Sequence, residues 1–517
     1  MSINRAAVFA ALFFVLQAGI ALAQDITLKS RDGSISLRGT LLGFDGEFYR
    51  IETRFGELTV DGSGVTCTGI GCPSLTDYVA DVTFSGSATL GRALLPALIE
   101  DFARRNGLDA RRTEGEALVY ALHEGKAGRL LGRFTLRNTD TDRGFADLLA
   151  DEADLAMALR EIRPEEAVLA REAGLGDLTQ ANRSRVLALD AMVPIVAPGN
   201  PLDRLSIAQV VDILAGEIRN WSELGGPDAP ITVHLRDNRA GMVQGLQDRL
   251  LRPQRRVLAE TTRRYGDNRS LVRAVMADPF GIGLTSLTET GQAKTLVLTG
   301  SCGFTLRAGR SSIKTEDYPL TAPMFLYSPA RRLPKLARDF LAYSHGPAAQ
   351  AAIRRAGFVD QAPEEIALDR QGDRLANAIA VAEGEEGLVV LQEMVADLAP
   401  MRRLSTTFRF ETGSSKLDAQ SRSNVLALAH ALETGVHDGR ELVFVGFSDG
   451  VGPASANLDI ARRRAEAVRD AVVTAAETAD LDRVTIGTQA YGEALPMACD
   501  DSAWGRQVNR RVEVWLR

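Results

Sequence analysis

The sequence is poor in aromatic residues, histidine and cysteine, and these shortages narrow the function. Aromatic residues make up 6% of the 517 positions, and only five histidines and four cysteines occur. The histidines form no close pair of the H-E-x-x-H type, which argues against a histidine-rich catalytic metal site. After residue 22, no apolar run approaches the roughly 20 residues that span a membrane. We therefore predict no metal, no cofactor and no internal membrane helix.

The charge balance and the length set further bounds. The formal net charge is -7, which argues against nucleic acid as a partner. Hydrophobic residues make up 45% of the chain, enough for sizeable cores. A chain of this length implies roughly three domains. We predict an α/β multidomain protein.

The N-terminus has the pattern of an export signal. Arg5 precedes an apolar run at residues 6–22, and residues 21–23 fit a small-residue cleavage site. This pattern predicts a secretory signal peptide at residues 1–23 that is removed. The alternative is an uncleaved membrane anchor.

Export makes disulfides available to the four cysteines. Cys67 and Cys72 flank a glycine-containing stretch and are predicted to close a tight loop. Cys302 and Cys499 lie far apart in sequence. They are either free or staple two domains, and we favour free and buried thiols.

Residues 25–75 have short alternating stretches separated by Asp-Gly turns. The turns fall at residues 32–33, 45–46 and 61–62, with strand-like runs on both sides. Asp-Gly between alternating apolar residues is a strong hairpin signal. We predict a small β module with a packing or docking role.

The stretch at residues 189–242 organises the middle of the chain. It reads as an apolar strand, a Pro/Gly turn, an amphipathic helix, a short strand and a polar glycine-containing loop that opens another helix. Such a loop brings backbone N–H groups and a helix N-terminus to one point, which suits an anion. Arg236, just before the loop, adds a fixed charge with several donors.

This stretch resembles the phosphate-binding proteins of ABC uptake systems, within the type II periplasmic binding-protein family. The motifs that carry the resemblance lie at residues 193–196, 200–201, 220–226, 236–237 and 241. The resemblance extends over residues 81–360 and implies a two-lobed fold that closes over its ligand by hinge motion. Residues 361–405 are predicted to form a helical connector.

The resemblance also implies a set of ligand-binding residues. The first ligand loop matches residues 85–91 and follows a strand at residues 81–84; the helix after it presents Leu94, Leu95, Leu98 and Phe102 on one face. The strand ending at Leu159 and Arg160 matches the family's next ligand-facing strand. The candidates for binding the anion are Ser87, Thr89, Arg160, Arg236, Arg239 and Gly241.

Two departures from the family pattern make orthophosphate uncertain as the ligand. Asp140 and Asp142 stand in a loop where relatives are rich in Gly and Ser, and a carboxylate there opposes an anion unless it accepts the ligand's proton or faces an arginine. Ala240 and Met242 replace two hydroxyl residues beside Gly241. Unpaired charge in a dry cleft is costly. Either Arg239 supplies the missing donors or the ligand is not orthophosphate.

The C-terminal part, residues 406–517, resembles the OmpA-like peptidoglycan-binding domain. The motifs lie at residues 408–417, 442–452, 457–468 and 509–514. The resemblance implies that Asp449 binds the ammonium group and Arg464 the carboxylate of a stem-peptide diaminopimelate, with Asn457 on the same helix. Residues 446–450 also fit the G-x-S-x-G nucleophile elbow, but that mechanism needs a later histidine and none follows His437. We predict that the protein is not an enzyme.

The sequence therefore predicts an exported protein of the periplasm that is bound to peptidoglycan at the inner face of the outer membrane of a Gram-negative-type envelope. Its fold class is α/β multidomain: a small N-terminal β module, a two-lobed type II binding-protein fold and a C-terminal α/β OmpA-like domain. Its partners are phosphate or a related oxyanion, and peptidoglycan. Delivery to an ABC permease, wall-bound capture and sensing are all compatible with this prediction. The alternative is a structural envelope scaffold with a non-functional cleft.

Overall fold

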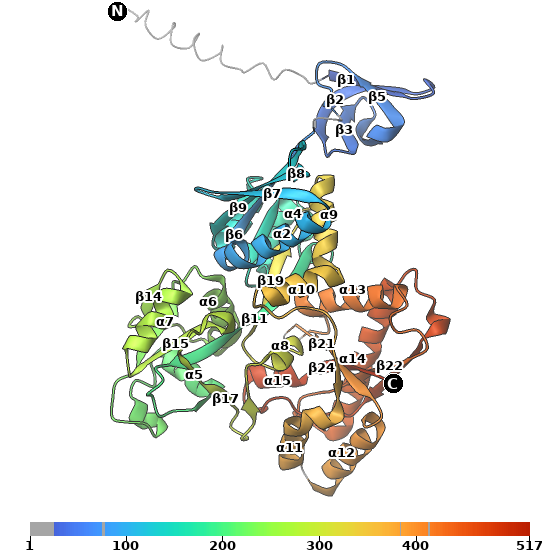
Figure 1. Ribbon diagram of the computed structural model, residues 1–517. Helices are drawn as coiled ribbons and strands as arrows, with labels where there is room; N and C mark the ends of the chain where they lie inside the picture. Colours follow the sequence, from blue (N-terminus) through green and yellow to red (C-terminus); the bar gives the residue numbers. More distant parts are fainter. Residues whose placement is uncertain (1–24, 75–77, 383, 412–413) are drawn as a thin grey trace, which may run out of the picture.

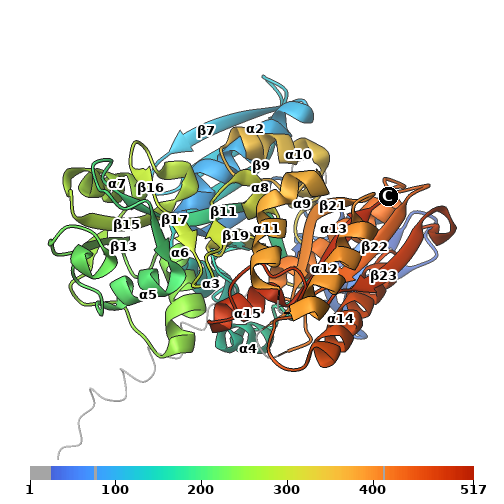
Figure 2. The same ribbon diagram turned by 90° about the horizontal axis from the view of Figure 1, so that it is seen from below.

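The computed structural model describes residues 25–74, 78–382, 384–411 and 414–517. The predicted signal peptide lies outside these residues. Figure 1 shows the N-terminal module at one end of the molecule, followed by the first lobe. The second lobe and the C-terminal domain lie beside each other at the other end, as Figure 2 also shows.

The N-terminal module is one antiparallel five-stranded sheet in the order β4-β3-β2-β1-β5. Ile26, Leu28, Tyr49 and Ile51 form its small core. A disulfide joins Cys67 and Cys72 just after the last strand. The strands are β1 (Asp25–Ser30), β2 (Ser36–Phe44), β3 (Phe48–Thr53), β4 (Gly56–Asp61) and β5 (Val65–Thr68).

The two lobes share one mixed sheet in the order β14-β13-β15-β11-β19-β10-β6-β9-β8-β7, with β16 paired to β11. The long strand β11 (Ser184–Val196) pairs antiparallel with β19 (Thr321–Tyr327), and these two strands connect the lobes. The first lobe contains β6 (Ala80–Ser87), β7 (Leu108–Glu114), β8 (Leu118–Glu124), β9 (Leu130–Thr139) and β10 (Leu155–Ala158). The second lobe contains β13 (Thr232–Arg236), β14 (Arg263–Tyr265), β15 (Gly281–Ser286) and β16 (Lys294–Thr295).

Helices cover both lobes because their apolar residues recur at helical spacing. The predicted stripe of Leu94, Leu95, Leu98 and Phe102 is buried, at most 3% exposed, and most of it belongs to α2 (Leu95–Arg105). The first lobe also has α3 (Thr141–Leu149), α4 (Pro164–Glu172), α9 (Lys335–His345) and α10 (Pro347–Arg355). The second lobe has α5 (Ile207–Ala215), α6 (Gly241–Leu246), α7 (Asn268–Ala277), α8 (Arg310–Lys314) and a small sheet of β12 (Arg204–Ser206), β17 (Val297–Thr299) and β18 (Thr305–Leu306).

The C-terminal domain is a five-stranded sheet in the order β20-β21-β24-β22-β23. Its strands are β20 (Glu365–Ala367), β21 (Arg402–Arg409), β22 (Glu441–Gly446), β23 (Thr485–Ala490) and β24 (Arg511–Leu516), and its helices are α11 (Gly372–Val381), α12 (Gly384–Leu398), α13 (Ala419–Glu433), α14 (Ala454–Ala475) and α15 (Ala503–Asn509). Leu391, Met394 and Leu398 of α12 pack in one core with Val443 and Trp515 of the sheet. The helical segment predicted as a connector thus packs on the C-terminal sheet, and the sequence did not predict β20.

The C-terminal domain is joined covalently to the second lobe. A disulfide links Cys302, beside β17 and β18, to Cys499, so the prediction that these two thiols are free is wrong. Nearby, Arg403 of β21 forms a buried ion pair with Asp317, with Nη1 and Oδ2 at 2.8 Å. The local sequence pattern could not show this pairing. The two cysteines are 197 positions apart, and only the docking of the two domains brings them together.

Candidate anion cleft and C-terminal site

A cavity of about 520 Å³ lies between the two lobes. Five of the six residues predicted to bind the anion line it: Ser87, Thr89, Arg236, Arg239 and Gly241. They come from the loop after β6 and from the loop between β13 and α6. The fold therefore gathers on one cavity residues that lie about 150 positions apart in the sequence.

Arg236 is the cation seated within this cleft. It is the last residue of β13 and is half-buried. Its Nε donates to the backbone oxygen of Tyr265 at 3.3 Å, and its Nη1 donates to Asn268 Oδ1 at 3.4 Å. Among the described residues, no carboxylate oxygen lies within 4.0 Å of its guanidinium nitrogens. The guanidinium is thus held in place by neutral acceptors, and the carboxylate that it acts on electrostatically, Asp267, lies beyond ion-pair distance.

Hydroxyl groups without partners line the same cleft. Neither Ser87 nor Thr89 makes a side-chain hydrogen bond to any described residue. Thr285 is 1% exposed, and its Oγ1 has no hydrogen-bond partner in the described part of the chain. A buried polar atom without a partner costs free energy, so these atoms suit a polar ligand.

The loop between β13 and α6 supplies fewer donors than the sequence predicted. Asp237 Oδ1 accepts the backbone N–H groups of Arg239 and Ala240, each at 3.1 Å. Those two amides are therefore occupied within the loop. The side chain of Arg239 is 79% exposed at the rim, with its Nε 4.0 Å from Asp140.

Gly241 has a packing role at the contact between the lobes. A Cβ atom at this position would overlap Oγ1 of Thr141, at the start of α3 in the first lobe, and would crowd Leu159. The glycine therefore allows the two lobes to touch beside the cleft.

The two aspartates of the second loop have structural partners. Asp140 caps α3 and accepts the backbone N–H of Arg143 at 2.9 Å. Asp142 accepts hydrogen bonds from Arg160 at 2.5 Å and from Gln244 at 2.6 Å. Burial acts to raise the pKa of Asp142, but these bonds hold it below its ordinary value.

Arg160, predicted to bind the anion, does not line the cleft and lies at the second cavity of the molecule. Its side chain is 3% exposed, and its guanidinium donates to both carboxylate oxygens of Glu166, at 2.6 and 2.8 Å. Further bonds go to Asp142, to Gln244 at 3.1 Å and to the backbone oxygen of Glu161 at 2.9 Å. Every nitrogen of the group is therefore occupied by the protein.

Sequence reasoning missed several residues of the cleft. Arg92 follows Thr89 by three positions and is exposed at the cavity, while Arg143 pairs with Asp147 at 2.5 Å. Asn138 also lines the cavity, and its buried Oδ1, which has no hydrogen-bond partner among described residues, faces Gly91. Arg92 and Arg143 each lie three positions, about one helical turn, after Thr89 and Asp140. This spacing was the sequence signal that could have placed them beside the cleft.

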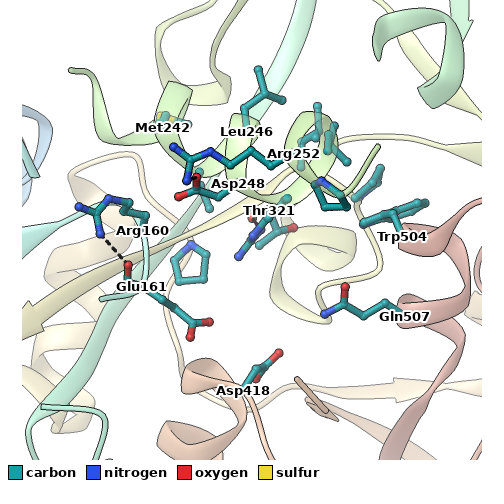
Figure 3. A pocket seen from close by; sticks show the side chains of 18 of the residues that line it. Arg160, Glu161, Met242, Leu246, Asp248, Arg252, Thr321, Asp418, Trp504 and Gln507 are labelled. Carbon is teal, nitrogen blue, oxygen red and sulfur yellow. Dashed lines mark hydrogen bonds and ion pairs between the residues drawn. The ribbon is translucent and has the colours of Figure 1, made fainter. Parts of the chain in front are cut away.

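A second cavity, of about 550 Å³, lies where both lobes meet the C-terminal domain. Figure 3 shows Arg160 at its edge and the carboxylates of Glu161 and Asp418 turned into it. Burial raises the pKa of Glu316, another lining residue, to about 8 despite the opposing charge of Arg409. The lining of this junction cavity carries five arginines and six carboxylic acids, whereas the lining of the cleft carries four arginines and two aspartates.

In the C-terminal domain, Asp449 lies close enough to Arg464 to affect the pKa of its guanidinium. Burial first, and then the neighbouring Arg510, lower the pKa of Arg464, while Asp449 acts against them. Asp449 already accepts a bond from Arg510, with Nη1 and Oδ2 at 2.9 Å, and Arg464 lies over the ring of Phe410. The sequence did not predict the role of Arg510.

Asn457 holds the site together from within. It is 3% exposed, and its Nδ2 donates to Glu493 Oε2 at 2.6 Å. The side-chain nitrogen of Asn457, which was predicted to contact peptidoglycan, is thus occupied by Glu493 of a neighbouring loop.

Two searches of the described residues bear on other functions. None of the helices in that part of the chain is both long and apolar enough to cross a membrane. No group of three or more His, Cys, Asp or Glu side chains there has an arrangement that could hold a metal ion.

Comparison with known proteins gives two family matches and several relatives. The family described as "PBP superfamily domain" matches residues 76–348, and the OmpA family matches residues 409–510. The chain is 23% identical to the phosphate-binding protein PstS of Borreliella burgdorferi over 201 residues, which are 37% of this chain and 71% of that protein. It is 29% identical to outer membrane porin F of Pseudomonas aeruginosa over 116 residues, 22% of this chain and 32% of that protein.

A solved structure also resembles the chain. It is an ABC-type phosphate transport receptor from Vibrio cholerae, with a TM-score of 0.42 and 19% identity, over 54% of this chain and 99% of the receptor. The first family match alone covers more than half of the 517 residues. The chain therefore belongs to the PBP superfamily domain family and carries an OmpA-family domain after it.

Proposed function

We propose that the cleft between the lobes binds an oxyanion. The observation that carries this proposal is Arg236, whose guanidinium is fixed by neutral acceptors and has no close carboxylate. The hydroxyls of Ser87, Thr89 and Thr285 line the same cavity without partners. A tetrahedral oxyanion offers the charge and the acceptor atoms that these groups lack. The similarity to a protein named for phosphate binding supports the proposal.

Calorimetric titration of the purified protein tests it. Inorganic phosphate, inorganic sulfate and phenyl phosphate are titrated into the wild type, Arg236→Ala and the control Arg273→Ala. Arg273 is an exposed arginine of α7 that does not line the cavity. We expect binding by the wild type and Arg273→Ala, and a loss of roughly tenfold or more in Arg236→Ala, since a hydrogen bond to a charged group contributes about 1.5–3 kcal/mol.

A specific observation favours a second candidate, a scaffold whose cleft binds nothing. Arg160 is taken up by protein partners, and Ala240 and Met242 stand where relatives have hydroxyls. The same titration separates the two functions. Absence of heat with all three anions would support the scaffold and refute the oxyanion proposal.

We further propose that the C-terminal domain attaches the protein to peptidoglycan in the periplasm, after export. The match to the OmpA family supports this, as does the closeness of one acidic and one basic group at Asp449 and Arg464. A diaminopimelate zwitterion needs one fixed charge of each sign. In this arrangement the protein captures or senses its ligand at the wall, or presents it to an ABC permease.

Sedimentation with purified peptidoglycan sacculi tests the anchor. Asp449→Ala and Arg464→Ala are compared with Asp459→Ala and Arg462→Ala, which alter an exposed ion pair on the same helix as Arg464. The wild type and the two controls should co-sediment, and the two site variants should stay in solution. Equal retention of all five proteins would remove the proposal.

A further inference from the structure

The lobes already touch each other in this structure. Gln244 of α6, in the second lobe, donates to Asp142 of the first lobe at 2.6 Å and accepts from Arg160 at 3.1 Å. A second bond joins Arg163 Nη2 to Asp248 Oδ2 at 3.3 Å. These contacts close one side of the cleft. The cavity therefore lies between lobes that already touch each other on one side.

The cavity is nevertheless large for an inorganic ion. Its volume is about 520 Å³, within the roughly 300–1,000 Å³ typical of sites for drug-sized molecules. A bare oxyanion bound at Arg236 would leave most of this volume to water. The space is appropriate to a ligand that carries more than its anionic group.

The lining of the cavity has an apolar wall beside its charged end. Leu159, Met192, Met242 and Leu284 line the cleft together with Arg236. Met242 stands where the sequence comparison placed a hydroxyl of the family. These side chains are at most 9% exposed, and Met242 is the most exposed of them. An inorganic ion makes no use of this apolar part of the lining, whereas an organic group can pack against it.

The exposed rim carries additional positive charge. Arg92 and Arg239 line the cavity from opposite lobes, and Arg239 lies 4.0 Å from Asp140, which lines the cavity too. The lining carries four arginines against two aspartates, so its net charge is positive. This distribution suits an elongated anion better than a small spherical one.

We infer that the ligand of the cleft is an oxyanion with an organic substituent, a phosphate monoester or a phosphonate, and that Met242 selects for the substituent. The inference rests on the proposed oxyanion function and specifies its ligand class. The anionic group is bound at Arg236 with Ser87 and Thr89. The organic group lies against Met242 and its apolar neighbours.

Titration of the full-length protein with phenyl phosphate and inorganic phosphate tests this. We expect phenyl phosphate to bind at least tenfold more tightly than inorganic phosphate to the wild type. Met242→Thr, which removes the apolar group and restores a hydroxyl, should reduce this ratio at least threefold. Met242→Leu keeps an apolar side chain and should preserve the ratio, and Met276→Thr, at a partly exposed methionine of α7, is the matched control.

The outcomes separate this inference from the oxyanion proposal. Equal or tighter binding of inorganic phosphate by the wild type would overturn the inference and leave the proposed function standing. An unchanged ratio in a folded Met242→Thr protein would remove Met242 as the selecting residue. Absence of binding by both compounds would overturn the inference, and absence of binding by inorganic sulfate as well would refute the proposed function.

Discussion

The anion cleft and the junction cavity are of similar size, but their charged groups are arranged in opposite ways. In the cleft, Arg236 has only neutral acceptors around it. At the edge of the junction, Arg160 is surrounded by Glu166, Asp142 and Gln244. Leu159, Met192 and Met242 line both cavities. The same three apolar side chains therefore separate the cleft from the junction cavity.

The contrast teaches that the partners of an arginine decide its role. A guanidinium whose donors are all satisfied by carboxylates contributes to the fold, because binding a ligand would require breaking those pairs. A guanidinium held by neutral groups keeps its charge for a ligand. The junction is accordingly expected to affect stability, and the cleft to affect affinity.

The disulfide between the lobe and the C-terminal domain should give the largest effect on stability. Replacing Cys302 and Cys499 with serine removes a cross-link between residues 197 positions apart, and we expect a loss of about 4 kcal/mol in the free energy of unfolding. Urea unfolding under non-reducing conditions measures it. The control is the Cys67→Ser, Cys72→Ser pair, whose cross-link spans 5 positions and should cost about half as much. Equal losses would contradict the role given to the junction.

Arg160→Ala should come next and sharpen the comparison directly. Removing a buried guanidinium leaves Glu166 and Asp142 without their partner, and we expect a loss of about 3 kcal/mol in unfolding free energy. Arg236→Ala should cost less than about 1 kcal/mol, since it breaks no ion pair within 4.0 Å. Urea unfolding and phosphate titration of both variants provide the measurements. The comparison fails if Arg160→Ala abolishes anion binding without loss of stability.

The last effect is the pH dependence of stability that comes from Glu316, which lines the junction cavity. Burial raises the pKa of Glu316 to about 8, so the folded state keeps its proton between the ordinary glutamate pKa of about 4.5 and pH 8, whereas the unfolded chain loses it. This group therefore stabilises the fold fully below about pH 4.5, and its contribution is lost as the pH rises through about 8. Between pH 5 and 8.5, the wild type should lose more free energy of unfolding than Glu316→Gln, which has no titrating group at this position. Glu172→Gln, at an exposed position of α4, should behave like the wild type in the same unfolding series.

Much of the fold could be predicted because its signals are local. The stripe of Leu94, Leu98 and Phe102 repeats at helical spacing and is buried as expected. The strand, loop and helix around Arg236 also follow from neighbouring residues, and the structure places Arg236 at the end of β13 with α6 beginning at Gly241. In each case the deciding interactions lie within one or two turns of the chain.

The errors concern interactions between distant parts of the chain. Arg160 meets partners 6, 18 and 84 positions away, so its neighbours in sequence gave no sign that they would consume its donors. The pairing of Cys302 with Cys499 depends on how two domains dock. Arg510 lies 61 positions from Asp449, yet binds it.

By itself, the sequence determined the strands, the helices, the two families and the loops from which a ligand can be held, because backbone preference and apolar spacing are properties of short segments. Only the tertiary structure decided which charges are neutralised, since a charge is paired or left unpaired by whatever side chain the fold brings within a few ångströms of it. That is why Arg236 and Arg160, the first and second candidates in the sequence, have different partners once the chain is folded.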